Sequence, residues 1–254
     1  MKKMFAAGLA AAILASAWMS GAVQAEETET AAGQTAQESG LAQDAPVEIP
    51  ETRPEYTASD YVDIRNEKYK GIRVSLYPPA DDSEEAQSAW QEAVDTQIMT
   101  QLFSMYPVNS WPEELMNYVA GNLVETYRQT ADMYGMDFSL FLETYLQTDL
   151  ESFTRQVETA AKQTLAEEMI LKAIAEKENI TVSDEEFEQG CERYAAQYGY
   201  DSADALKQAF DEPTIRISLL MDKTFEFLEG AADIQLIIET ETETENGPET
   251  ETGM

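Results

Sequence analysis

Hydrophobic residues recur at helical spacing between positions 149 and 179. They fall three or four positions apart, as Leu150, Phe153, Val157, Ala161, Leu165, Met169 and Ala173. This interval matches the α-helical repeat and places these side chains on one face of a long amphipathic helix. An apolar face of this length needs a partner surface, so we expect the rest of the chain to pack around it.

A second helix is predicted to follow the long one after a short break. Ile180, Thr181 and Val182 are β-branched, which makes them poor helix formers. Ser183 is a favourable N-cap, and Glu186 three residues later completes a capping box. We therefore expect a turn at residues 180–182 and a new helix from Ser183.

The same spacing predicts further helices on both sides of this pair. They span residues 83–106, 111–134, 138–146 and 203–210, with a last helix from Pro213 onward. Ser110 is expected to cap the second of them, with Pro112 in its first turn. Residues 61–64 and the alternating Ile72, Val74 and Leu76 predict two short extended pieces. The fold class is therefore all-α, with a short extended segment at residues 56–80 before a helical domain at residues 81–238.

Composition adds two stretches without an apolar repeat and a strong negative charge. Residues 26–55 are expected to be a disordered acidic linker, and residues 239–254, with their Glu-Thr alternation, a disordered tail. The chain carries 49 acidic and 16 basic residues, a net charge of −33, and no histidine. This charge repels nucleic acid and anionic membrane surfaces, so we expect no nucleic-acid partner.

The first 25 residues have the features of a signal peptide. Lys2 and Lys3 precede an apolar, Ala-rich run that ends in Val23-Gln24-Ala25, small residues typical of a cleavage site. The apolar run is short for a bilayer span, although a retained anchor is the alternative. We therefore expect cleavage, no stable membrane insertion afterwards, and an exported, extracytoplasmic protein.

No pattern for catalysis or for metal binding emerges from the sequence. Acidic pairs such as Glu167-Glu168 are expected by chance in so acidic a chain, and most often form a solvated helix face. Cys191 is the single cysteine and is expected to act as a small apolar residue. No nucleophile elbow, phosphate loop or zinc spacing occurs. We therefore predict no catalytic residues, no metal site and no cofactor.

Four segments of the helical region resemble a known family. They are GMDFSLFLETYL, MILKAIAEKENITVSDEEF, YAAQYGYDSADALKQ and IRISLLMDKTFEFL. In content, order and spacing they resemble the C-terminal, SurA-like domain of bacterial trigger factor, a chaperone that also carries a prolyl-isomerase domain. DYVDIRNEKYKGIRVSL resembles the segment that precedes the isomerase domain in that family. The resemblance implies a bundle with helical arms that holds unfolded polypeptide clients.

The resemblance does not extend to the other domains of that family. Between the matched segments, residues 77–110 read as one helix and a turn, whereas a compact isomerase domain needs on the order of 100 residues. The Gly-Phe-Arg signature of the ribosome-docking domain is also not found. We therefore expect neither prolyl isomerisation nor a ribosome partner.

The candidate client-binding residues lie where two predicted helices meet, around Pro107. They are Met99, Phe103, Tyr106, Trp111 and Met116. Flexible methionines and aromatic rings adapt to many client shapes, although each of these residues could equally belong to a packed core. The leading hypothesis is an exported chaperone that acts without ATP. The alternatives are a peptidyl-prolyl isomerase and a dedicated envelope-assembly adaptor.

Overall fold

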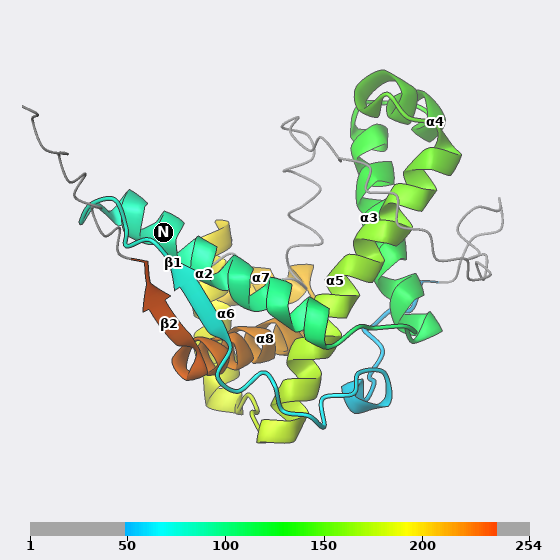
Figure 1. Ribbon diagram of the computed structural model, residues 1–254. Coiled ribbons are helices and arrows are strands. Elements are labelled where there is room, and N and C mark those ends of the chain that lie inside the picture. The colour runs from blue at the N-terminus through cyan, green and yellow to red at the C-terminus, as the bar shows by residue number, and fades with distance from the viewer. Residues whose placement is uncertain (1–48, 238–254) are drawn as a thin grey trace, which may run out of the picture.

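The computed structural model describes residues 49–237, and these residues are mainly helical, which confirms the all-α prediction (Figure 1). The expected signal peptide, most of the expected linker and the tail at residues 239–254 lie outside the described residues. In chain order the elements are η2 (Ala58–Asp60), β1 (Arg73–Leu76), α2 (Glu84–Met105), α3 (Glu113–Met133), α4 (Phe138–Phe141), η3 (Leu142–Leu146), α5 (Leu150–Glu178), α6 (Asp184–Tyr198), α7 (Ala203–Ala209), α8 (Glu212–Ala231) and β2 (Asp233–Leu236).

Side-chain caps define most of the helix starts. Ser83, Asp149 and Ser202 each accept a hydrogen bond from a backbone N–H in the first turn of α2, α5 and α7. At α6 the expected capping box is present, since Ser183 Oγ accepts from Glu186 N and Glu186 Oε2 accepts from Ser183 N at 2.8 Å. Asn179, in the left-handed conformation at φ 57°, ends α5. The predicted break between α5 and α6 is thereby confirmed.

The start of α3 differs from the prediction. The helix begins at Glu113 with Pro112 as its extended N-cap residue, so Ser110 does not cap it. The reason is steric, because the residue before a proline is driven out of the helical region and Trp111 cannot begin a turn.

The extended region also differs from the prediction. Residues 61–64 form no strand, whereas β1 pairs in parallel with β2, a strand at the other end of the described chain. The strand β2 was not predicted, because the sequence analysis placed residues 81–238 in a helical domain. The pairing places Val74 in the core, fully buried against α2.

Helix α5 is the centre of the arrangement and contacts α2, α3, α8 and η2. At ~1.5 Å per residue its 29 residues span about 43 Å. Its first half packs on α3, and these two helices with α4 and η3 project as an arm from the remaining helices, the body (Figure 1). Its second half is buried in the body, where Met169, Ile170 and Leu171 are all inaccessible to solvent.

A smaller apolar cluster lies between α6, α7 and α8. Phe187, Cys191 and Leu206 are among its buried members, so the single cysteine packs as the apolar residue that we expected. Gly190 allows α6 to approach α8, because a Cβ at this position would lie 2.4 Å from Leu219 Cδ2. Among the described helices, none combines the length and the apolar character that a membrane crossing would need.

The described residues include the last part of the expected linker, residues 49–55. Arg53 is buried, and its side chain pairs with Glu168 of α5. The last residues of the expected linker are therefore attached to the body, because the buried Arg53–Glu168 pair and the Tyr56 ring hold them there. Residues 77–110 form α2 and its flanking turns, which leaves no room for an inserted domain there.

The capping box at α6 gives a direct test of the fold. Replacing Ser183 with Ala leaves the N–H of Glu186 without its acceptor and should lower the free energy of unfolding by about 1 kcal/mol in urea denaturation. Thr159→Ala is the control, since that hydroxyl bonds only to a carbonyl of its own exposed helix turn. Equal stability of Ser183→Ala and the wild type would show that α6 does not depend on this cap.

Candidate functional site

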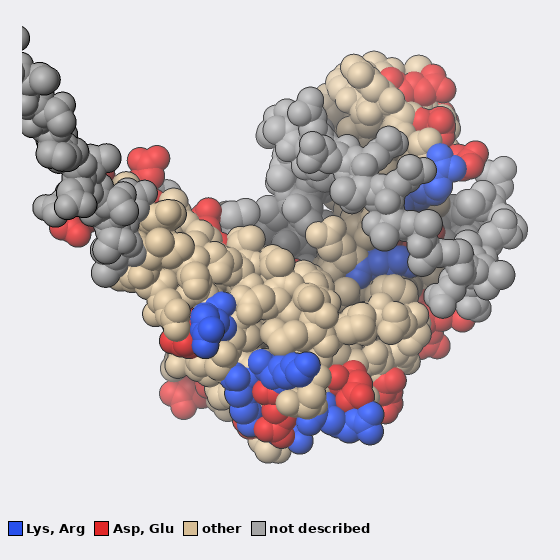
Figure 2. All heavy atoms as spheres, viewed as in Figure 1, with Lys and Arg blue, Asp and Glu red and all other residues tan. Residues whose placement is uncertain are grey.

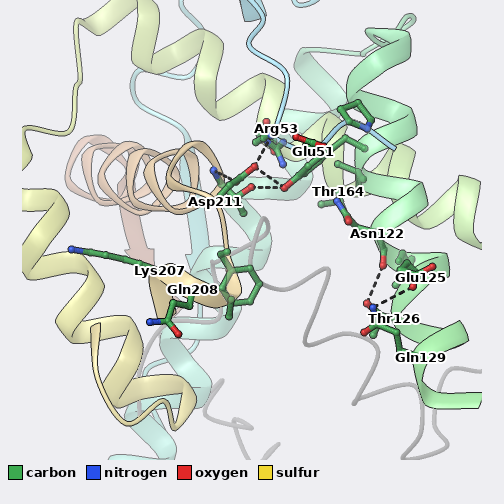
Figure 3. Close-up of a pocket in the computed structure, with 18 of the residues that line it drawn as sticks. Glu51, Arg53, Asn122, Glu125, Thr126, Gln129, Thr164, Lys207, Gln208 and Asp211 are labelled. Atoms are coloured by element: carbon green, nitrogen blue, oxygen red, sulfur yellow. Dashed lines mark hydrogen bonds and ion pairs between the residues drawn. The ribbon is translucent and has the colours of Figure 1, made fainter. Parts of the chain in front are cut away.

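A cavity of about 630 Å³ lies between the arm and the body (Figure 3). Helix α3 contributes Tyr118, Asn122 and Gln129. The residues before η2, 49–57, which we call the N-terminal segment, contribute Glu51 and Arg53. The other side comes from α5 and from the junction of α7 and α8. The remaining lining residues are Pro50, Val119, Leu123, Glu125, Thr126, Thr164, Glu168, Tyr200, Lys207, Gln208, Ala209, Phe210, Asp211 and Thr214.

The base of this cavity is a buried charge network. The Arg53 guanidinium donates to Glu168 Oε2 at 2.5 Å, and the Tyr56 hydroxyl donates to Glu168 Oε1 at 2.9 Å. Burial raises the pKa of Tyr56, and the nearby Glu168 carboxylate raises it further, so the phenol stays protonated and remains a donor. Lys172 lies over the Tyr56 ring and also donates to the Tyr56 carbonyl. The network fixes the N-terminal segment to α5.

Asp211 connects three elements at the rim of the cavity. Its carboxylate caps α8 by accepting from Thr214 N at 2.9 Å, and it also accepts the Arg53 backbone N–H at 2.6 Å. The Tyr118 hydroxyl of α3 donates to the same carboxylate at 3.1 Å. The geometry of the arm base therefore depends on one carboxylate that joins α3, α8 and the N-terminal segment.

The chemistry of the cavity suits non-covalent binding. Along α3, Asn122, Thr126 and Gln129 present amides and hydroxyls toward it (Figure 3). Within residues 49–237, no group of His, Cys, Asp or Glu side chains has the arrangement of a metal site. Groups of this kind can hydrogen-bond a polypeptide backbone, while the apolar lining residues Val119, Leu123 and Phe210 can contact its side chains.

The end of the arm carries a second feature, a cluster of exposed apolar side chains that we call the arm-tip cluster. It consists of Met133, Tyr134, Leu140, Tyr145 and Leu150, of which Met133 is 85% exposed. Tyr134 and Tyr145 stack at 5.3 Å between ring centroids, and both contact the buried ring of Phe141. In the space-filling view, the end of the arm is largely uncharged surface bordered by acidic side chains (Figure 2).

The five residues predicted from the sequence divide into two groups. Met99, 6% exposed, and Tyr106, 1% exposed, belong to the main core, and the Tyr106 hydroxyl binds Asn66 and the Tyr69 N–H. Phe103 is 36% exposed, while Trp111 and Met116 are partly buried against the core. The indole N–H of Trp111 is buried without a hydrogen-bond partner among the described residues. The geometry therefore separates the accessible members from the two that fill the core.

Sequence reasoning missed the cavity and the arm-tip cluster as sites. Met133, Tyr134 and Phe141 were visible as part of a run rich in methionine and aromatic rings, but the sequence alone did not show which of them were covered. Arg53 carried no signal, because it lies in a Pro-rich stretch of low hydrophobicity.

Comparison with known proteins gives one consistent family. The family model described as bacterial trigger factor protein (TF) C-terminus matches residues 82–229. A trigger factor of Caldicellulosiruptor saccharolyticus is 30% identical over 54% of this chain and 31% of its own length. One from Halalkalibacterium halodurans is 27% identical over 71% of this chain and 41% of its own length, and one from Bacillus cereus 31% identical over 48% and 28%. No solved structure matches the chain.

These comparisons correct one expectation and limit another. The chain spans about three tenths of the length of the first curated relatives that it matches. The expected exported, extracytoplasmic location is wrong on this comparison, because the relatives are trigger factors, and that name denotes a cytoplasmic, ribosome-associated chaperone. The apolar, Ala-rich start had suggested export, but it lies outside the described residues.

The buried pair at the cavity base predicts strong coupling between two side chains. Arg53→Met should lower the free energy of unfolding by about 3–5 kcal/mol, because it leaves the Glu168 carboxylate buried and uncompensated. The double variant Arg53→Met with Glu168→Met should cost clearly less than the sum of the two single changes. Denaturant unfolding of all four proteins measures this coupling.

A matched control is the exposed pair of Arg65 and Asp63. Its side-chain atoms also lie 2.5 Å apart, but the two side chains are largely solvated. Arg65→Met should therefore leave the melting temperature nearly unchanged. Additive effects of Arg53→Met and Glu168→Met would contradict the network.

Glu167, next to Glu168 on α5, predicts a pH dependence of stability. Burial, with added repulsion from Glu168, raises the pKa of the Glu167 carboxyl from 4.5 to about 7. Between these two values the folded state holds a proton that the unfolded state releases, so this group makes stability fall as pH rises through the window. Glu167→Gln should therefore raise the free energy of unfolding by about 1–3 kcal/mol at pH 8 and change it little at pH 4.

Unfolding curves at both pH values measure this difference. The exposed Glu143 of η3 provides the control substitution, Glu143→Gln. A Glu167→Gln effect of equal size at pH 4 and pH 8 would show that the carboxyl is not protonated in the folded protein.

Proposed function

Because the chain belongs to the family of the bacterial trigger factor C-terminus, we propose that it is a molecular chaperone that holds unfolded polypeptides without ATP. The observation that carries this proposal is the arm-tip cluster, which leaves several large apolar side chains open to water. Clusters of this kind on a soluble protein mark interaction surfaces. Methionine and tyrosine also adapt to different client side chains.

The cavity between the arm and the body offers the second part of the client site. A client segment held at the arm tip would meet the amides and hydroxyls of Asn122, Thr126 and Gln129 further down α3. Phe103, Trp111 and Met116 are proposed as an additional apolar contact at the junction of α2 and α3. Met99 and Tyr106 would support this contact from within the core.

The strong negative charge supports a holding function. With a net charge of −33, two copies of the chain repel each other, and this repulsion counteracts self-association through the exposed apolar clusters. The same charge does not prevent the binding of unfolded polypeptides that are neutral or basic.

The test compares the arm-tip cluster with one exposed aromatic side chain elsewhere on the surface. Met133→Ser with Leu140→Ser should reduce the suppression of aggregation of an unfolded protein several-fold, while the melting temperature stays nearly unchanged because both side chains are exposed. Tyr77→Ser, which removes an exposed aromatic side chain away from the arm, serves as the control. Undiminished suppression by the double variant would refute the arm tip as the client site.

The same assay tests the α2–α3 junction and the two alternative functions. Phe103→Ser should weaken holding without loss of stability, whereas Met99→Ser should destabilise the fold because it places a hydroxyl in the core. Isomerisation of a proline peptide at catalytic protein concentrations would favour an isomerase. A single stoichiometric partner in pull-down experiments would favour an adaptor.

A further inference from the structure

Strands β1 and β2 form a two-stranded sheet, so each strand has an inner edge that faces the other strand and an outer edge that faces away from it. Asp233 N donates to Ile72 O at 2.8 Å, and Ile237 N donates to Leu76 O at 2.8 Å. In a parallel ladder, alternate residues bond to the same neighbour. The backbone groups of Ile234 and Leu236 therefore face away from β1.

The outer edge of β1 is closed by side chains of α2. Gln97 forms a pair of bonds with Ser75, since its Oε1 accepts from Ser75 N at 3.2 Å and its Nε2 donates to Ser75 O at 3.0 Å. Gln101 Nε2 donates to Arg73 O at 2.9 Å. These two amides occupy the positions that a neighbouring strand would take.

The outer edge of β2 has no such cover among residues 49–237. β2 lies at the margin of the described structure, with β1 between it and α2 (Figure 1). All four of its residues are exposed, and Leu236 is 52% exposed. Ile234 and Leu236 thus combine apolar side chains with outward-facing backbone donors and acceptors. Such an edge is a template for another strand.

The net charge of the chain and the sequence that follows β2 select the occupant. A second copy would bring another chain of net charge −33, and after Ile237 and Ile238 the sequence alternates Glu and Thr from Glu239. Pairing of two such strands would place carboxylates near carboxylates. We infer that the open edge of β2 binds an extended polypeptide segment with alternating apolar side chains and flanking Lys or Arg, by strand addition.

This inference deepens the proposed holding function, because it assigns a second site and a preferred class of polypeptide segment. Strand addition supplies affinity through main-chain hydrogen bonds and is tolerant of side-chain sequence. Ile234 and Leu236 each offer one N–H and one C=O to the incoming chain. The basic flanks add attraction that weakens as salt increases.

The experiment measures binding of a labelled peptide, Lys-Val-Thr-Val-Thr-Val-Lys, to the full chain by fluorescence anisotropy. Ile234→Pro removes an outward N–H without touching the bonds from Asp233 and Ile237 to β1, and proline is tolerated at such an edge position. This variant should weaken binding at least tenfold with an unchanged circular dichroism spectrum. The same peptide with Glu in place of Lys should bind more weakly, and the difference should shrink at high salt.

A second measurement does not depend on the folding of any variant. Methylation of the alternate peptide nitrogens that would pair with β2 should abolish binding to the wild-type protein, whereas methylation of the other set should have little effect. The inference is overturned if the peptide does not bind the wild-type protein, or if the Ile234→Pro protein binds it as tightly as the wild type does. It is also overturned if both methylated peptides bind the wild-type protein as tightly as the unmethylated peptide. A dimer in light scattering that Ile234→Pro dissociates would likewise overturn it. The protein with Met133→Ser and Leu140→Ser should still bind the peptide. The proposed client site at the arm tip and the proposed strand-addition site at β2 are therefore tested independently.

Discussion

The Glu168 carboxylate sits in the most buried part of the central helix, and the rest of the architecture has to accommodate it. An isolated charge there would be very unfavourable, so the chain brings in a guanidinium and a phenol from the N-terminal segment. This requirement fixes residues 53–56 against α5. The same segment reaches Asp211 at the start of α8, and through Tyr118 the base of α3. One buried charge thus determines how the arm is attached to the body.

The arm can expose apolar side chains because other aromatic rings, which belong to the main core, hold its helices together. Phe153 of α5 contacts Tyr127 of α3 and Phe138 of α4 with edge-on ring geometry. These contacts hold the two helices together along the arm without using the rings of Tyr134 and Tyr145 at its end. Helix α5 continues from these ring contacts into the body without a break, so the arm-tip cluster is presented from a helix that is anchored in the main core.

Local patterns predicted the helices well, whereas the contacts between distant parts of the chain could not be predicted. The stop at Asn179 and the capping box at Ser183 depend on a few adjacent residues, and both are present. The pairing of β1 with β2 depends on two short segments at opposite ends of the described chain, and β2 alone resembles the end of an apolar helix. The same limit applies to the site. Helical spacing places Met99 and Phe103 on the apolar side of one helix, but it does not show which of the two side chains is buried by the rest of the fold.

The parallel pairing of β1 with β2 has a consequence for the order in which the protein can mature. Contacts between segments far apart in the sequence form slowly, because a long loop must close before they gain anything. During synthesis, β1 is made first, and β2 is made only after almost all of the other described residues. Gln97 and Gln101 already cover its outer edge, so only the inner edge at Ile72, Val74 and Leu76 stays open until Asp233 arrives. Closure of this sheet therefore requires the chain as far as Ile237, and a product that ends before Asp233 is left with an unpaired apolar strand.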